Sequence, residues 1–384
     1  MKVILDSNCI QPRLTGIGRY AYALIEGLLQ HKRIAATYLY QHRKIATALP
    51  AIDTAETVLQ KNQHWKRFEL VRRLHGLYRH WDDRCFRKEV ASLQPQIYHA
   101  PNFIARPTVV PTVVTIHDFS FLHFPEFHPQ ERLLFLQKHF PRTLAQAAHF
   151  ITDSDFIKQE MIERYHLPAD KITVIHLGVS KQYHPRTEAE TNPVLQKHGL
   201  HFGLYLFSAA TIEPRKNLKN ILAAYVALPK NLQKQFPLVL AGSPGWLSDE
   251  LHRQIQRLQG LGLLKYLGYI PESELQAIYA GARAFVFPSY YEGFGLPVLE
   301  AMASGTPVLT THLSAMAEVT GSAAHLVNAE DASNIQQGLE NLLTDDAYWA
   351  IKRAQGLEQA KRYTWDQCIE KTVAVYQQIN RERS

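Results

Sequence analysis

Short apolar runs alternate with amphipathic stretches along almost the whole chain, and this alternation restricts the fold more than any other feature of the sequence. The pattern is typical of βα units, in which helices cover both faces of a parallel sheet. In the first half we predict strands at Val3–Leu5, Ala36–Tyr40, Ile97–His99, Val113–Ile116, His149–Thr152 and Ile172–Ile175. In the second half the apolar runs lie at residues 203–209, 238–242, 264–268, 284–287, 307–310 and 325–327. The sequence therefore predicts an α/β protein with two doubly wound, Rossmann-like halves.

Chain length supports the same division, because 384 residues are too many for one ordinary hydrophobic core. The alternation is lost between residues 184 and 199, a stretch that contains two prolines. We place the linker there, between a first domain at 1–185 and a second at 200–365. Neither half contains a full G-x-G-x-x-G motif, so hydride transfer with a dinucleotide is not indicated.

Composition narrows the class of protein. No run approaches the roughly 18 apolar residues of a membrane-spanning helix. The chain begins directly with a predicted strand and has no signal region, so we expect it to stay in the cytoplasm. Cys9, Cys85 and Cys368 lack metal-ligand or CxxC spacing and are expected to be reduced thiols. A net charge of +7 favours anionic partners such as phosphates, acidic lipids or nucleic acid.

Two glutamates flank a Gly-Phe-Gly turn in the segment 288–310. Pro297 is expected to be the first helical residue, which places Glu292 in the loop before the helix and Glu300 about one turn into it. Free N–H groups at a helix start attract phosphate, and carboxylates on either side can hold sugar hydroxyls. The arrangement suits a nucleotide sugar. The simpler interpretation is a capped helix with two ordinary acidic residues.

These residues give the chain its resemblance to a known family, the GT4 glycosyltransferases, which have the GT-B fold, retain anomeric configuration and share a Glu-x7-Glu motif. The resemblance implies that Glu292 contacts the donor sugar and Glu300 the ribose, while the loop residues Gly293, Phe294, Gly295 and Leu296 line the donor site. It extends over nearly the full length and is weakest between residues 40 and 95. It is greatest to bacterial mannosyltransferases of O-antigen and exopolysaccharide synthesis, which implies GDP-mannose as donor. It also implies that a C-terminal helix, 366–384, packs back on the first domain.

Arg215 and Lys216 follow the first strand of the second half, at the sheet edge where open α/β proteins bind ligands. An isolated Arg-Lys pair is usually solvated surface. Such cations can also neutralise a departing diphosphate without a metal. Their place before Glu292 and Glu300 matches the family's cationic pair, so we expect both to be catalytic.

Two further motifs fall at strand ends of the first half. Gly16 and Gly18 lie between the first strand and a helix predicted at Tyr20–Gln30, where backbone can approach a phosphate or sugar. They match the family's glycine loop, although a flexible turn would look the same. His117 follows a predicted central strand, and the resemblance implies that it faces the donor sugar. We expect it to be a catalytic residue that positions the sugar and the acceptor or transfers a proton. Asp118 is expected to orient backbone or acceptor.

Asp153 and Asp155 form a D-x-D pair, which in the unrelated GT-A fold holds a divalent metal. The pair also reads as a helix start, with Asp153 or Ser154 as the N-cap. We favour the cap and predict no metal site, because the family is metal-independent. Ser154 and Lys158 are expected to face the cleft between the two Rossmann-like domains that the GT-B fold implies.

A basic amphipathic stretch covers residues 61–90, with nine Lys or Arg against four Asp or Glu. One interpretation is a helix packed on the first domain with a solvated basic face. The other is an interfacial helix that binds anionic lipid. No nucleic-acid module accompanies the charge, so nucleic acid is not expected as a partner.

The sequence thus predicts a retaining hexosyltransferase. It is expected to move mannose from a nucleotide-diphosphate sugar to a lipid-linked saccharide acceptor in surface polysaccharide synthesis. No cofactor is expected. One alternative is a nucleotide-sugar epimerase on the same fold, which would act on a UDP-sugar without an acceptor. The other is an inert nucleotide-sugar-binding protein, which the complete set of charged site residues disfavours.

Overall fold

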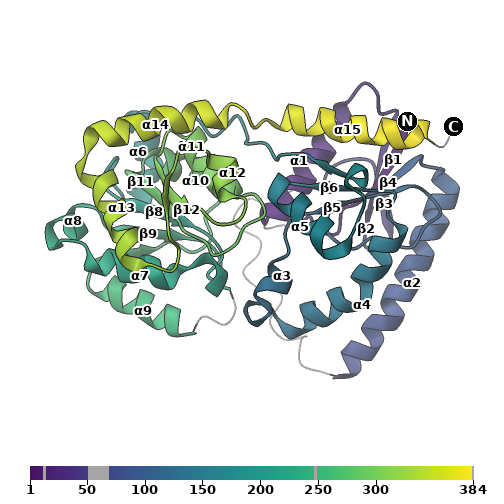
Figure 1. Ribbon diagram of the computed structural model, residues 1–384, viewed down its shortest axis with the longest axis horizontal. Coiled ribbons are helices and arrows are strands. Elements are labelled where there is room, and N and C mark those ends of the chain that lie inside the picture. Colours follow the sequence, from purple (N-terminus) through teal and green to yellow (C-terminus); the bar gives the residue numbers. More distant parts are fainter. Residues whose placement is uncertain (12–13, 51–68, 246–248, 383–384) are drawn as a thin grey trace.

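The computed structural model describes residues 1–11, 14–50, 69–245 and 249–382; for 69–78 it describes the backbone alone. Two sheets lie side by side, each covered by helices (Figure 1). The first sheet has the order β3-β2-β1-β4-β5-β6-β7 and the second β10-β9-β8-β11-β12-β13. The strands are β1 Lys2–Asp6, β2 Ala36–Gln41, β3 Lys44–Ala46, β4 Ile97–Ala100, β5 Thr112–Ile116, β6 His149–Thr152, β7 Ile172–Val174, β8 Leu206–Ala209, β9 Leu238–Ala241, β10 Leu264–Tyr266, β11 Ala284–Phe287, β12 Val308–Thr311 and β13 His325–Val327.

All predicted strands are present, and every described pairing except one is parallel. The exception is β3, which the sequence did not indicate; it pairs antiparallel with β2 after a turn in which His42 and Arg43 adopt positive φ. Strand side chains are buried on both faces: Val3, Ile4 and Leu5 are fully buried in β1. Continuous apolar runs are what a parallel sheet between two helix layers requires.

The helices follow the predicted alternation. They are α1 Gly16–Gln30, α2 Glu69–Leu93, α3 Ser120–His123, α4 Gln130–Gln146, α5 Asp155–Tyr165, α6 Glu188–Lys197, α7 Leu218–Ala227, α8 Lys230–Gln235, α9 Asp249–Gly260, α10 Glu272–Ala280, α11 Leu296–Ala303, α12 Met316–Thr320, α13 Ala332–Thr344, α14 Asp346–Ala360 and α15 Trp365–Arg381; short 3-10 helices are η1 Pro125–Phe127, η2 Ala169–Lys171 and η3 Pro214–Lys216. Helix α1 begins four residues before the predicted start, because the Thr15 side chain accepts a hydrogen bond from Gly18 N and caps it. No described helix is both long and apolar enough to cross a lipid bilayer.

Residues 188–197 of the predicted linker form a helix, α6. Thr187 and Glu190 make a reciprocal capping box at its start. Leu195 is fully buried and belongs to the main hydrophobic core. The helix tolerates Pro193 in its interior and packs against α10 of the second half.

The chain passes between the two halves at adjacent places. Val179, after the last strand of the first sheet, pairs in parallel with Thr364, just before α15. Helix α15, yellow in Figure 1, then lies along α1 of the first half. The contact is close: a β-carbon at Gly27 would lie 2.0 Å from Ile369 Cδ1. The domain limits at 185 and 200 remain predictions.

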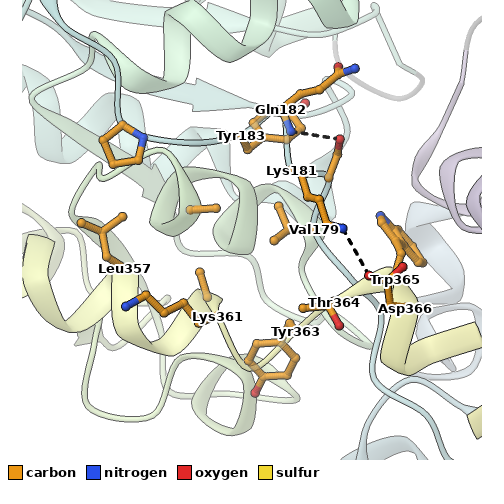
Figure 2. Close-up of a pocket in the computed structure, with 14 residues that line it drawn as sticks. Val179, Lys181, Gln182, Tyr183, Leu357, Lys361, Tyr363, Thr364, Trp365 and Asp366 are labelled. Carbon is orange, nitrogen blue, oxygen red and sulfur yellow. Dashed lines mark hydrogen bonds and ion pairs between the residues drawn. The ribbon is translucent and has the colours of Figure 1, made fainter. Parts of the chain in front are cut away.

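Both crossing segments line a cavity of about 550 Å³ (Figure 2). Its wall carries mainly apolar side chains, among them Tyr183, Leu357 and Trp365. Lys181 at its edge pairs with Asp366 at 3.3 Å, and both side chains are largely exposed. None of the residues predicted to bind a nucleotide sugar lines this cavity.

Candidate functional site

A second cavity, also of about 550 Å³, is bounded by loops of both halves. It collects almost all of the predicted site residues in one place: Gly16, His117, Arg215, Lys216, Glu292, Gly293, Phe294, Gly295, Leu296 and Glu300. Gly18 is the exception. It is buried in the first turn of α1, where its N–H donates to the Thr15 hydroxyl, and it does not line the cavity.

The predicted cationic pair lies in η3, directly after β8. Asn217 ends this turn in a left-handed conformation, and its side-chain amide donates to the carbonyls of Pro288 and Ala329. This fixes η3 against the segment that follows β11. Arg215 Nη1 and Lys216 Nζ consequently lie 3.1 Å and 2.6 Å from the carboxylate of Glu292.

Glu292 is only 8% exposed. Burial alone would raise its pKa, but the charges of Arg215 and Lys216 hold the pKa of this carboxyl below its usual range. Arg215 also contacts Glu213 at 2.8 Å and donates to the carbonyl of Tyr291. A diphosphate that entered the cavity would compete with these carboxylates for the two cations.

Glu300 lies one turn into α11, as expected. The helix begins at Leu296, so Pro297 is its second residue and not its first; Gly295, at a φ of 97°, reverses the chain before it. Glu300 accepts a hydrogen bond from Arg19 Nη1 at 2.5 Å, and Arg19 also contacts Glu272 at 2.6 Å. Burial raises the pKa of Glu300 to about 7 despite the Arg19 charge. Arg19 thus links α1 to the two glutamates across the cavity.

His117 is held by a partner that the sequence did not reveal. Its Nδ1 lies 2.6 Å from Asp153 Oδ2, and its Nε2 lies 2.9 Å from the carbonyl of Pro101. Both ring nitrogens therefore face acceptors, which requires a proton on each. Asp153, with help from the Pro101 carbonyl, raises the pKa of His117 against the opposing effect of burial. Because both ring N–H groups are donated to acceptors, His117 has no free nitrogen with which to abstract a proton.

The prediction that Asp153 or Ser154 caps a helix is confirmed, and the capping residue is Ser154. Ser154 Oγ accepts from Ile157 N at the start of α5 and donates to the carbonyl of Gly293 in the second half, but Ser154 does not line the cavity. Asp153 is 2% exposed, and its Oδ2 pairs with Nδ1 of His117. Lys158 is partly buried and does not line the cavity.

The two aspartates of the D-x-D pair belong to different groups of side chains. Asp155 lies with His176 and Glu318, whose carboxylate accepts the N–H groups of Asp155 and Phe156 and so closes the start of α5. Asp153 faces His117 instead. The pair therefore does not converge on one metal site, in contrast to the GT-A arrangement.

Asp118 orients the backbone at Ser120, as predicted from its position directly after His117. Its Oδ1 accepts from both N and Oγ of Ser120, at 3.0 Å and 2.8 Å. Burial would raise its pKa, but the Arg215 charge and the Ser120 hydrogen bonds lower it. Asp118 therefore stays ionised at the cavity wall.

Residues 61–68 of the basic stretch lie outside the described residues, and the rest belongs to α2. Phe86 and Val90 of this helix are buried in the same hydrophobic cluster as Ile4 and Tyr98, so α2 packs on the first sheet. Trp81 remains 56% exposed, with the Arg43 guanidinium 4.3 Å from its ring centroid. Helix α2 is therefore packed on the first domain on one face and exposes a basic and aromatic face on the other.

Comparison with known proteins identifies the family. Residues 14–183 match the family model described as Glycosyltransferase Family 4, and residues 197–363 match Glycosyl transferases group 1. The chain is 36% identical over 379 residues to O-antigen chain mannosyltransferase B of Escherichia coli, covering 98% of this chain and 99% of that protein. The chain belongs to the GT4 glycosyltransferases.

Solved structures place this GT4 protein in the GT-B fold. It is similar to WaaG, described as a glycosyltransferase involved in lipopolysaccharide biosynthesis, with a TM-score of 0.73 at 14% identity and coverage of 98% and 99% of the two chains. It is also similar to Anabaena HepE in complex with UDP and glucose, with a TM-score of 0.71 at 16% identity and coverage of 98% and 100%. At these identities the likeness establishes the fold.

Proposed function

We propose that this glycosyltransferase transfers mannose from GDP-mannose to a saccharide acceptor, with retention of anomeric configuration, in the synthesis of a surface polysaccharide such as O-antigen. Its similarity to an O-antigen chain mannosyltransferase along the whole chain supports the sugar and the process. The observation that carries the chemistry is the contact of Arg215 and Lys216 with Glu292 inside one cavity.

The two cations are in place to receive the diphosphate of the donor. Negative charge grows on the leaving phosphate as the glycosidic bond breaks, and preorganised cations stabilise that charge without a metal. When the diphosphate takes over Arg215 and Lys216, Glu292 becomes free to accept hydrogen bonds from hydroxyls of the sugar.

Retention follows from substitution on one face of the sugar. The acceptor oxygen attacks from the side on which the diphosphate departs, and the departing phosphate oxygen takes the acceptor's proton. Arg215 and Lys216 hold the phosphate in position for that transfer. Glu300 binds the ribose once Arg19 is displaced from it.

Location and acceptor form part of the same proposal. We place the enzyme in the cytoplasm, in peripheral contact with the anionic inner face of the membrane, acting on a polyprenyl-diphosphate-linked saccharide. The exposed Trp81 and the basic side chains Arg84 and Arg87 of α2 would supply that contact.

A direct test compares nucleotide sugars. Thermal denaturation with GDP-, UDP-, ADP- and dTDP-sugars should show the largest stabilisation with GDP-mannose. Transfer from GDP-mannose to a mannoside should give an α-linked product by NMR and should continue in excess EDTA. Stabilisation by UDP-sugars alone, with conversion of the sugar in the absence of acceptor, would instead establish an epimerase.

A further inference from the structure

One histidine in the wall of the donor cavity has no structural task. His128 lies between η1 and α4 and lines the same cavity as Arg215 and Glu292. It is only 7% exposed, yet neither of its ring nitrogens has a hydrogen-bond partner among the described residues. Buried polar groups are nearly always paired, so an unpaired imidazole at a cavity wall calls for an external partner.

The turn that carries His128 is held rigidly in place. The rings of Phe124 and Phe127 stack at 5.4 Å with an interplanar angle of 3°, and His128 N donates to the carbonyl of Pro125. The next residue, Pro129, caps α4, a helix of 17 residues. The imidazole is therefore positioned before any ligand arrives, which is how binding sites gain precision.

A second unpaired group lies one helical turn further on. Arg132, in the first turn of α4, also lines the cavity and is partly exposed, and its guanidinium makes no side-chain hydrogen bond or ion pair within the described parts of the chain. Burial and the charges of Arg132 and Arg215 lower the pKa of His128, against the effect of Asp118. The imidazole is thus neutral, with one nitrogen as donor and the other as acceptor.

The mixture of charges decides which ligand fits. Arg132 supplies donors, while Asp118 and Glu213 supply acceptors at the same wall. Sugar hydroxyls both donate and accept, and this set of side chains matches them.

We propose that His128 and Arg132 form the subsite for the terminal sugar of the acceptor, with Asp118 as a further hydrogen-bond acceptor. The proposal rests on the proposed function and adds to it the place where the acceptor saccharide binds. His128 exchanges hydrogen bonds with one sugar hydroxyl, and Arg132 donates to a neighbouring hydroxyl oxygen. Neither residue takes part in bond breaking.

The test separates acceptor binding from donor binding. His128→Phe keeps a ring of similar size without nitrogens, His128→Gln restores a donor and an acceptor, and Arg132→Met removes the charge. Arg142→Met is the matched control, because Arg142 lies on the same helix, is exposed and does not line the cavity. Transfer from GDP-mannose to octyl α-mannoside is measured over a range of acceptor concentrations, together with the affinity for GDP.

We expect His128→Phe and Arg132→Met each to raise the KM for octyl α-mannoside by about tenfold or more, because each leaves a sugar hydroxyl unpaired. GDP affinity should remain within about twofold, His128→Gln should recover most of the loss, and Arg142→Met should match the wild type. An unchanged acceptor KM in both variants would overturn the subsite. A fall in GDP affinity as large as the rise in acceptor KM would also overturn it. Failure of the wild-type enzyme itself to transfer from GDP-mannose would overturn the proposed function, and the role of the subsite with it.

Discussion

Replacing Glu292 with glutamine tests how the charges in the cavity are shared. In the structure this carboxylate contacts Lys216 at 2.6 Å and Arg215 at 3.1 Å and is 8% exposed. Removing one partner from a buried ion pair typically costs about 3–5 kcal/mol. The amide oxygen of glutamine still accepts from Lys216, so we expect a loss near the lower value, about 3 kcal/mol.

The same change should not weaken nucleotide binding. In the wild type the diphosphate must displace Glu292 from the cations, whereas in Glu292→Gln the cations are already available. GDP should therefore bind at least as tightly to the variant, and at a hundred times its Kd it should return about 2.7 kcal/mol of stability. Turnover should be lost, because the carboxylate that holds the sugar is missing.

Thermal denaturation with and without GDP, calorimetric GDP titration and a transfer assay measure the three quantities. At about 2–4 °C per kcal/mol for domains of this size, the free variant should melt about 6–12 °C below the wild type. Glu250→Gln is the control, since that carboxylate forms an exposed ion pair with Arg253 and should matter little. Wild-type stability of the free variant, or parallel loss of GDP affinity and turnover, would refute the reasoning.

Three further predictions concern other parts of the site and surface. Because the folded-state pKa of His117 is raised, its pairing with Asp153 should contribute stability fully below about pH 6.5 and lose it as pH rises through the raised pKa. Asp153→Asn should therefore cost about 3 kcal/mol in urea denaturation at pH 6 and less at pH 9; equal losses at both would contradict the pairing. Lys216→Ala should lower turnover about 100-fold while excess EDTA leaves the wild type active; loss of wild-type activity in EDTA with recovery in manganese would contradict the assignment. Binding to phosphatidylglycerol vesicles should decline with salt and on exchanging Arg84 and Arg87 for glutamate, and a salt-independent absence of co-sedimentation would favour a purely packed α2.

Much of the fold was predictable because parallel strands are buried on both faces and therefore appear as apolar runs. Helix α6 was missed although its capping signal, Thr187 followed by Glu190, is present in the sequence. Pro193 and the lack of periodic apolar residues outweighed that signal. A capping box was here a better guide than hydrophobic periodicity.

The motifs of the site could be found in the sequence, but not all of the contacts between them. His117 and Asp153 are 36 positions apart, yet each directly follows a residue of the paired couple Ile116 and Thr152 in β5 and β6. Only the order of strands in the sheet brings them together. Local sequence could not show that Asp153 pairs with His117 and that Ser154 is the cap, because it gives no information on which strands are neighbours.

Contacts between the two halves could not be predicted from the sequence. Arg19 directly follows Gly18 in the sequence, but its pairing with Glu300 depends on how two separately folded sheets face each other. The same holds for Gly293, where an added β-carbon would lie 1.6 Å from the carbonyl oxygen of His117. Such a close approach explains why this loop position needs a residue without a side chain. No local sequence pattern predicts this approach.

The adjacent passages of the chain at Val179 and Thr364 limit how the two halves can move. A protein joined at two distant points could only flex, and one joined at a single point could tumble freely. Two neighbouring connections act together as a pivot: the halves can swing apart on the cavity side while this backbone pairing stays intact. Rotation about the pivot would have to break and remake the contacts between the halves, among them those of Arg19 with Glu300, Ser154 with Gly293 and Glu318 with the start of α5.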